Sequence, residues 1–225
     1  MNELVAGIDL CDEYTQVNCN DEEKTWTFPT VLCRHKVSGT WSVGEDAYAQ
    51  TLRGEGSLTD KLVKLVLKEG TATLEGIRYT AVELLERFLE RVLWQVQKNL
   101  GTEAGFQELV FTVRSLDERL TEALYSCGEK LGVDRARIRV IGHTEGLIYY
   151  MLSQKKEIWS GTVGLFDLSE QELRYYELKV QRGLKQNAVL AEFERIEESF
   201  SLDILETPSG AKLGDKILCT CAERL

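Results

Sequence analysis

Apolar and polar residues alternate in short segments along the first part of the chain. Leu4–Leu10, Thr15–Asn20 and Trp26–Arg34 alternate or run apolar over strand lengths, with turn-type residues between them. Thr40–Val43 is a fourth short strand candidate, which follows a Ser-Gly turn. These patterns predict that the chain begins with several strands connected by tight turns.

The pattern then changes to helical spacing. A helix-like segment begins at Gly44, and helical spacing returns from Leu62 until Gly70. Thr71–Tyr79 has the pattern of a hairpin that turns at Glu75-Gly76.

A long helix is predicted to begin at Thr80. Thr80 and Glu83 fit a capping box, in which a hydroxyl and a carboxylate satisfy unpaired amides at a helix start. Gly101 provides a typical stop signal. The apolar face of this helix consists of Val82, Leu85, Leu89, Val92 and Val96.

Strands and helices alternate after this helix. The predicted segments are a strand at Glu108–Arg114, a helix ending at Gly132, a strand at Arg137–Ile141 and a helix from Glu145 to Leu152. Ser115 and Glu118 fit a second capping box, and Leu116 begins the apolar stripe behind it. The alternation favours a three-layer α/β arrangement with parallel strands.

A second unit is predicted after the polar segment Ser153–Ser160. Strand patterns resume at Thr162–Leu168, Glu172–Val180 and Ala188–Phe193, and a final helix is expected after Leu213-Gly214. Both units begin with a strand, an Asp-Leu turn and a second strand, which suggests an internal duplication. We therefore expect two lobes, residues 1–155 and 160–225.

Composition narrows the classes of function. The chain has 225 residues, 43% of them hydrophobic, and a net charge of −10. A surface of that sign repels phosphate backbones and anionic lipids, so we expect neither nucleic-acid nor membrane binding. No apolar run approaches a membrane span of about 20 residues, and no signal peptide is visible, so we expect a cytoplasmic protein.

Cysteine and histidine give no clear motif. The six cysteines are Cys11, Cys19, Cys33, Cys127, Cys219 and Cys221. Their spacing lacks the clustered four ligands of a structural zinc site, so they are interpreted as reduced thiols packed like small apolar groups. His143 has no evident Ser, Cys or Asp partner in the sequence, and a catalytic triad is therefore not predicted.

The order of elements resembles that of actin-like and heat-shock chaperone ATPases, whose halves each have a ribonuclease H-like fold. The motifs that carry the resemblance are Gly7-Ile8-Asp9-Leu10, Pro29-Thr30-Val31, Val43-Gly44-Glu45-Asp46-Ala47, Phe166-Asp167-Leu168 and Leu213-Gly214-Asp215. The resemblance implies an α/β fold with a mixed sheet flanked by helices. Because that family continues well beyond the Leu-Gly turn, it also implies an incomplete second lobe and a fragment of a longer protein.

The resemblance places two turns where that family binds the phosphates of ATP. Asp9 and Asp167 match the aspartates that hold the magnesium shell through water. The family's glycine and hydroxyl positions correspond here to Cys11, Asp12 and Glu13 in the first turn, and to Ser169, Glu170, Gln171 and Glu172 in the second. Carboxylates at these tips would repel a triphosphate, at about 4 kcal/mol for each like-charge pair 4 Å apart in an effective dielectric of 20.

Other residues of that active site have weaker counterparts. Glu145 is at the place of an acidic residue that positions the attacking water, although a glutamate at a helix start is also favoured by the helix dipole. Lys61 and Lys64 lie in the region of a phosphate-binding lysine, on a helical pattern whose solvated face is the ordinary alternative.

We therefore expect a degenerate, non-catalytic ATPase-like domain that serves as a protein-interaction or scaffold module and needs no cofactor. One alternative is a Mg-ATP-binding, slowly hydrolysing domain of a longer protein. Another is a regulatory domain that binds a divalent cation through oxygen ligands. The acidic residues considered for that cation are Asp9, Asp12, Glu13, Asp167, Glu170 and Glu172, with Asp9 and Asp167 as the principal metal ligands.

Overall fold

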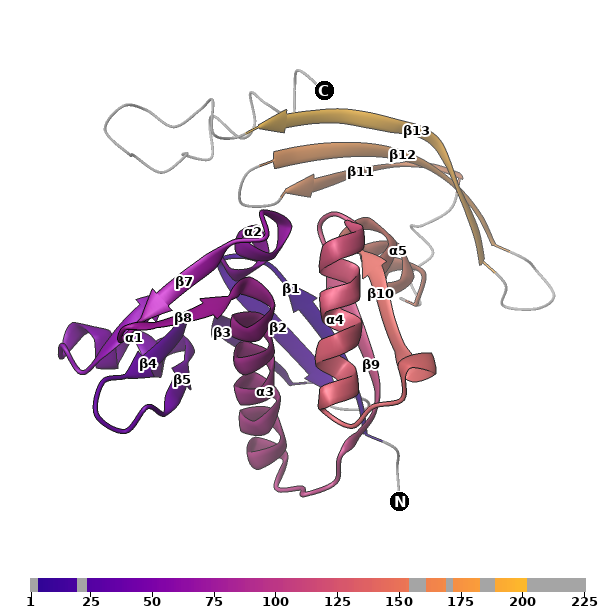
Figure 1. Ribbon diagram of the computed structural model, residues 1–225. Helices are drawn as coiled ribbons and strands as arrows, with labels where there is room; N and C mark the ends of the chain where they lie inside the picture. The colour runs from indigo at the N-terminus through magenta and orange to yellow at the C-terminus, as the bar shows by residue number, and fades with distance from the viewer. Residues whose placement is uncertain (1–3, 20–23, 154–160, 169–171, 183–188, 202–225) are drawn as a thin grey trace. The chain divides into compact units, whose positions relative to one another are not determined.

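The computed structural model describes residues 4–19, 24–153, 161–168, 172–182 and 189–201. It divides into two compact units, Met1–Gly146 and Leu147–Leu225, which are described separately below. The first unit contains a mixed sheet with helices packed against it (Figure 1), which confirms the expected α/β class. Among the described residues, no helix has both the length and the apolar character needed to cross a membrane.

Five strands form the central sheet of the first unit. They are β1 (Leu4–Leu10), β2 (Tyr14–Cys19), β3 (Thr25–Pro29), β9 (Phe106–Val113) and β10 (Ile138–Gly142), in the order β10-β9-β1-β2-β3. Strand β9 pairs in parallel with both β1 and β10, whereas β1, β2 and β3 pair antiparallel as a meander. The carboxyl ends of β1, β9 and β10 therefore meet at one edge of the sheet.

Helices α3 (Ala81–Leu100) and α4 (Glu118–Lys130) pack on one face of this sheet (Figure 1). The largest fully buried side chains in this core are those of Ile8, Leu10, Leu32, Leu62, Leu84, Leu85, Phe88, Leu89, Leu93, Leu109, Phe111 and Leu120. Successive strand residues point to opposite faces, so Asp9 and its register partner Thr112 lie on the face away from these two helices.

The predicted capping box of α3 is confirmed. The Thr80 hydroxyl accepts from the Glu83 amide at 3.3 Å, and the Glu83 carboxylate accepts from the Thr80 amide at 2.8 Å. Gly101 ends the helix with φ of 66°, a left-handed conformation that glycine adopts without steric cost.

The start of α4 differs from the sequence prediction. Asp117, not Ser115, is the N-cap, and its carboxylate accepts from the amides of Arg119 and Leu120 at 2.9 and 3.3 Å. Leu116 therefore precedes the helix and is 59% exposed, so its assignment to the apolar stripe was wrong. The carboxylate of Asp117 is an equally good cap and places the following leucines on the buried face.

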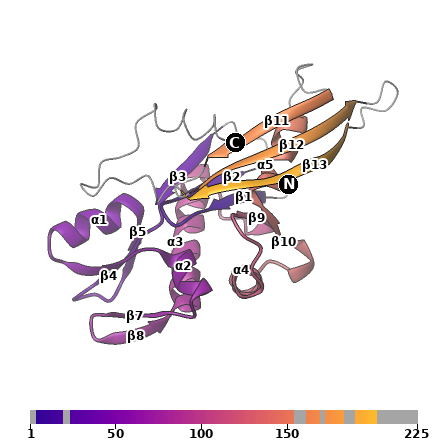
Figure 2. The same ribbon diagram turned by 90° about the horizontal axis from the view of Figure 1, so that it is seen from above.

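An insertion connects β3 to α3 on the side of the sheet away from β10 (Figures 1 and 2). Its elements are β4 (Leu32–His35), β5 (Trp41–Val43), α1 (Gly44–Leu52), β6 (Gly56–Thr59), α2 (Leu62–Leu67), β7 (Thr71–Leu74) and β8 (Ile77–Thr80). Strands β4, β5 and β6 form a small sheet, and β7 and β8 form the hairpin predicted at Glu75-Gly76.

The single strand predicted at Trp26–Arg34 is divided in two. Strand β3 ends at Pro29 and β4 begins at Leu32 in a different sheet. At the break, the Thr30 amide donates to the Glu13 carbonyl at 2.8 Å, and the Thr30 hydroxyl bonds to that of Thr15 at 2.8 Å in a fully buried position. These bonds hold the bend against the Asp-Leu turn.

The second unit contains an antiparallel sheet of β11 (Gly161–Leu168), β12 (Glu172–Arg182) and β13 (Val189–Ser201). All three strands were predicted, although β13 extends eight residues further than expected. Helix α5 (His143–Ser153) begins in the first unit directly after β10. The helix predicted after Leu213 lies outside the described residues, and the two-lobe assignment of residues 1–155 and 160–225 stays a prediction.

We predict that Leu89→Ala lowers the free energy of unfolding by about 2–5 kcal/mol, because it leaves a cavity in the α3 interface with the sheet. Leu52→Ala is the matched control, since Leu52 at the end of α1 is 88% exposed while Leu89 is fully buried. The control is expected to change stability by no more than about 0.5 kcal/mol. Urea denaturation of both variants measures the difference, and equal effects would contradict the described core.

Candidate functional site

Three parallel strands bring polar side chains to one edge of the central sheet. Asp9 lies near the carboxyl end of β1, and its register partner Thr112 lies near the end of β9. His143 follows the last residue of β10 and begins α5. In open α/β sheets, the carboxyl ends of parallel strands are where ligands usually bind, so this edge is the candidate site.

Asp9 and His143 form an ion pair. The Asp9 Oδ1 atom lies 2.5 Å from His143 Nε2, and it also accepts from the Thr112 hydroxyl at 2.8 Å. The Asp9 side chain is 46% exposed, whereas that of His143 is 16% exposed. Burial acts most strongly on the pKa of Asp9 and raises it, but the bond and charge of His143, with the bond from Thr112, lower this pKa overall. Asp9 is therefore a carboxylate at neutral pH.

Cys11 completes a cluster of three. Its Sγ atom lies 3.9 Å from the same His143 Nε2 atom, although the residues are 132 positions apart in the sequence. The potential ligand atoms of Asp9, Cys11 and His143 all lie within 4.8 Å of one another, and each residue is partly exposed. Sequence reasoning missed this cluster because it considered His143 without its neighbours in space.

The cluster does not have the geometry of a nucleophile–histidine–acid relay. In such a relay one ring nitrogen faces the nucleophile and the other faces the acid. Here Asp9 and Cys11 both face Nε2 of His143. Instead, one nitrogen faces both a carboxylate and a thiol, which brings three potential ligand atoms together.

Asp12, predicted to face a phosphate, caps a helix instead. Its Oδ1 atom accepts from the amides of Val63 and Lys64, at 2.9 and 3.3 Å, at the beginning of α2. The residue before α2, Lys61, has a left-handed conformation with φ of 53° and no side-chain cap of its own. Asp12 therefore supplies from 51 residues away the cap that the local sequence of α2 lacks.

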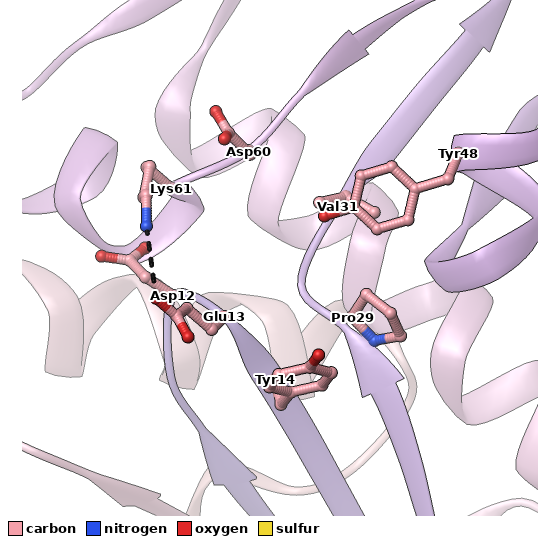
Figure 3. A pocket seen from close by; sticks show the side chains of 8 residues that line it. All are labelled: Asp12, Glu13, Tyr14, Pro29, Val31, Tyr48, Asp60 and Lys61. Carbon is pink, nitrogen blue, oxygen red and sulfur yellow. Dashed lines mark ion pairs between the residues drawn. The ribbon is translucent and has the colours of Figure 1, made fainter. Parts of the chain in front are cut away.

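Glu13 lies beside a small pocket of about 220 Å³ (Figure 3). Its carboxylate is 4.0 Å from the Lys61 ammonium. The pocket is lined by Asp12, Glu13, Tyr14, Pro29, Val31, Tyr48, Asp60 and Lys61, and Figure 3 shows Pro29, Val31 and Tyr48 across from Lys61. Three carboxylates against one ammonium give it a negative charge, and its volume is below the 300–1,000 Å³ that is typical of ligand pockets.

The second Asp-Leu hairpin is present in the second unit. Asp167 in β11 lies opposite Arg174 in the register of the antiparallel strands, and Glu172 is the first residue of β12. The turn residues Ser169, Glu170 and Gln171 lie outside the described residues. Asp9 and Asp167 belong to different units, so a shared site for them stays a prediction.

The other candidates from the sequence lie as follows. Glu145 is exposed in the first turn of α5. Cys19, Cys33 and Cys127 are buried, as expected for thiols packed like apolar groups. Burial raises the pKa of Cys127 well above its usual range, so its thiol does not ionise at neutral pH. Cys11 differs from these three because it is partly exposed and lies beside a histidine.

The fold and the site together define an α/β protein with an Asp-Cys-His cluster at the carboxyl ends of parallel strands. Residues 13–225 match the model described as the C-terminal part of a family of unknown function, DUF5716. The chain therefore belongs to this family. A search of curated proteins finds no match.

We predict that Asp12→Ala lowers the free energy of unfolding by about 1 kcal/mol, because α2 loses its only side-chain cap among the described residues. Asp12→Asn keeps an oxygen acceptor and should cost less. Glu13→Gln is the neighbouring control and is expected to be nearly neutral, since its ion pair with Lys61 is long and exposed. Urea denaturation measures all three, and an Asp12→Ala variant as stable as Glu13→Gln would contradict the cap.

Proposed function

We propose that this chain is a degenerate ATPase-like domain of ribonuclease H-like fold, which does not hydrolyse ATP and serves as a protein-interaction or scaffold module. The observation that carries the proposal is the engagement of two aspartates at the first Asp-Leu turn. Asp9 is paired with His143, and Asp12 is bonded to the amides of α2. The resemblance assigns these positions to the magnesium shell and to the phosphates.

The topology of the first unit supports the family part of the proposal. The β1–β2–β3 meander precedes α3, and β9, α4 and β10 then form a parallel crossover unit. This succession follows the order in the chaperone branch of the ATPase superfamily. The Pro29-Thr30-Val31 motif ends β3, and Val43 immediately precedes α1, as the resemblance implies for its proline strand and Val-Gly-Glu turn.

The charges around the turn support the non-catalytic part. A nucleotide bound there as in the active relatives would need Asp9 to release His143, and Asp12 to stop capping α2. The second change would leave two helix amides without their partner, at a cost of about 1 kcal/mol. The carboxylates of Glu13 and Asp60 line the pocket beside Asp12, and they would repel the phosphates.

The sheet of the second unit supports the interaction part. Within residues 161–168, 172–182 and 189–201, β11 and β13 each pair on one side only, with β12. An exposed strand edge offers backbone amides and carbonyls to which a partner strand can be added. Phe166 on β11 is 49% exposed, and its ring lies 5.0 Å from that of Tyr175 in a tilted arrangement, which adds an apolar contact on that sheet.

We predict that calorimetric titration with Mg-ATP detects no binding at nucleotide concentrations up to about 1 mM, which corresponds to a binding free energy weaker than about −4 kcal/mol. A dissociation constant in the micromolar range, or measurable ATP hydrolysis, would overturn the proposal in favour of a working ATPase domain. A tagged full chain should also retain its protein partner in the presence of Mg-ATP. Release of that partner by nucleotide would point to the same alternative.

A set of substitutions tests why Mg-ATP is expected not to bind. Replacing Asp12 and Glu13 with Thr, and Glu170 and Gln171 with Gly, removes three of the four carboxylates at the turns and should create or increase affinity for Mg-ATP. Threonine at position 12 keeps an oxygen that can cap α2, so the fold is expected to be retained. Glu45→Thr with Asp46→Thr is the matched control, because it removes two charges in the first turn of α1 and leaves the Asp-Leu turns intact.

A further inference from the structure

We propose that Asp9, Cys11 and His143 bind a Zn²⁺ ion at the carboxyl edge of the central sheet. The three side chains come from two segments more than 130 residues apart in the sequence, and they converge within the first unit. Their ligand atoms lie within 4.8 Å of one another. The site shares Asp9 with the first Asp-Leu turn, but Cys11 and His143 are not part of any sequence motif for a metal.

The donor atoms select the metal. A thiolate, an imidazole nitrogen and a carboxylate oxygen are the three ligand types that Zn²⁺ accepts. Mg²⁺ and Ca²⁺ prefer oxygen ligands alone, so the acidic set considered from the sequence would suit them, and this mixed set does not. The cluster therefore favours zinc over the cations of a nucleotide site.

One of the two ligand distances is close to that of a tetrahedral zinc site, and the other is that of a direct hydrogen bond. Ordinary Zn–S and Zn–N bonds place sulfur and nitrogen about 3.6 Å apart, and the Cys11 Sγ to His143 Nε2 distance is 3.9 Å. Ordinary Zn–O and Zn–N bonds place oxygen and nitrogen about 3.4 Å apart, whereas Asp9 Oδ1 lies 2.5 Å from the same nitrogen. The Asp9 side chain is half-exposed, so it can rotate. A rotation that moves Oδ1 away from Nε2 by about 1 Å would give both atoms the separation of two zinc ligands.

The surroundings of the cluster fit a metal site with one open position. Thr112 donates to Asp9 Oδ1 at 2.8 Å, and a hydrogen bond of this kind to a ligating carboxylate holds it in orientation. All three ligand residues are partly exposed, so an ion can reach them. Three protein ligands leave the fourth tetrahedral position to water or to a side chain of a protein partner, in contrast to a closed structural site.

The test is a titration of the metal-stripped full chain with Zn²⁺ in competition with a chromogenic chelator. We expect one equivalent to bind. Cys11→Ser and His143→Ala should each weaken binding by more than about 100-fold, and Thr112→Val by about 10–100-fold, as is usual for residues that hydrogen-bond to a metal ligand. His35→Ala is the matched control, because His35 is the other histidine of the chain and bonds to the Ser38 hydroxyl instead. It should leave the affinity unchanged.

Cobalt provides a second readout that requires a sulfur ligand. Co²⁺ bound to the unaltered chain should show a thiolate-to-metal charge-transfer band in the near ultraviolet, which Cys11→Ser removes. If Cys11→Ser fails to fold, the spectrum of the unaltered chain decides, and absence of the band overturns the proposal. Zinc binding that survives both Cys11→Ser and His143→Ala, but is lost on replacing Cys219 and Cys221, also overturns it. Either result leaves the Mg-ATP titration as a separate test of the proposed function.

Discussion

The parallel pairing of β1, β9 and β10 is the constraint on which the rest of the first unit depends. It requires a crossover between β9 and β10, and α4 supplies this connection and packs with α3 on the sheet. It also directs the carboxyl ends of all three strands to one edge, where Asp9, Thr112 and His143 meet. The core and the candidate site are consequences of the same pairing.

The acidic residues of the first turn have a different role in this fold from the one that their sequence position suggests. A carboxylate in a phosphate-binding turn suggests repulsion of a ligand. In the structure, Asp12 is a hydrogen-bond acceptor for a helix whose first residues have no local cap, and Asp9 is a partner for His143. Both charges are therefore used within the protein, and the turn connects the central sheet to the insertion through α2.

Much of the fold was accessible from the sequence because its signals are local. The Thr80 capping box, the apolar face of α3 and the hairpins at Glu75-Gly76 and after Asp167 depend on residues a few positions apart. The errors arose where two local signals compete. Ser115 and Asp117 are both good N-caps, and only the packing of α4 selects Asp117. The apolar run through Pro29 continues from one sheet into another, so its pattern does not show where the first strand ends. The hydrogen bond between the Thr15 and Thr30 hydroxyls stabilises the bend at that point.

The sequence by itself determined the α/β class, the order of most elements and the two Asp-Leu hairpins, because hydrophobic period and capping act over a few residues. Only the tertiary structure decided what the polar residues of the first turn contact. Asp12 meets α2 from 51 residues away, and Cys11 meets His143 from 132 residues away. Such contacts depend on strand register and on the direction of strand ends, which a one-dimensional pattern does not contain.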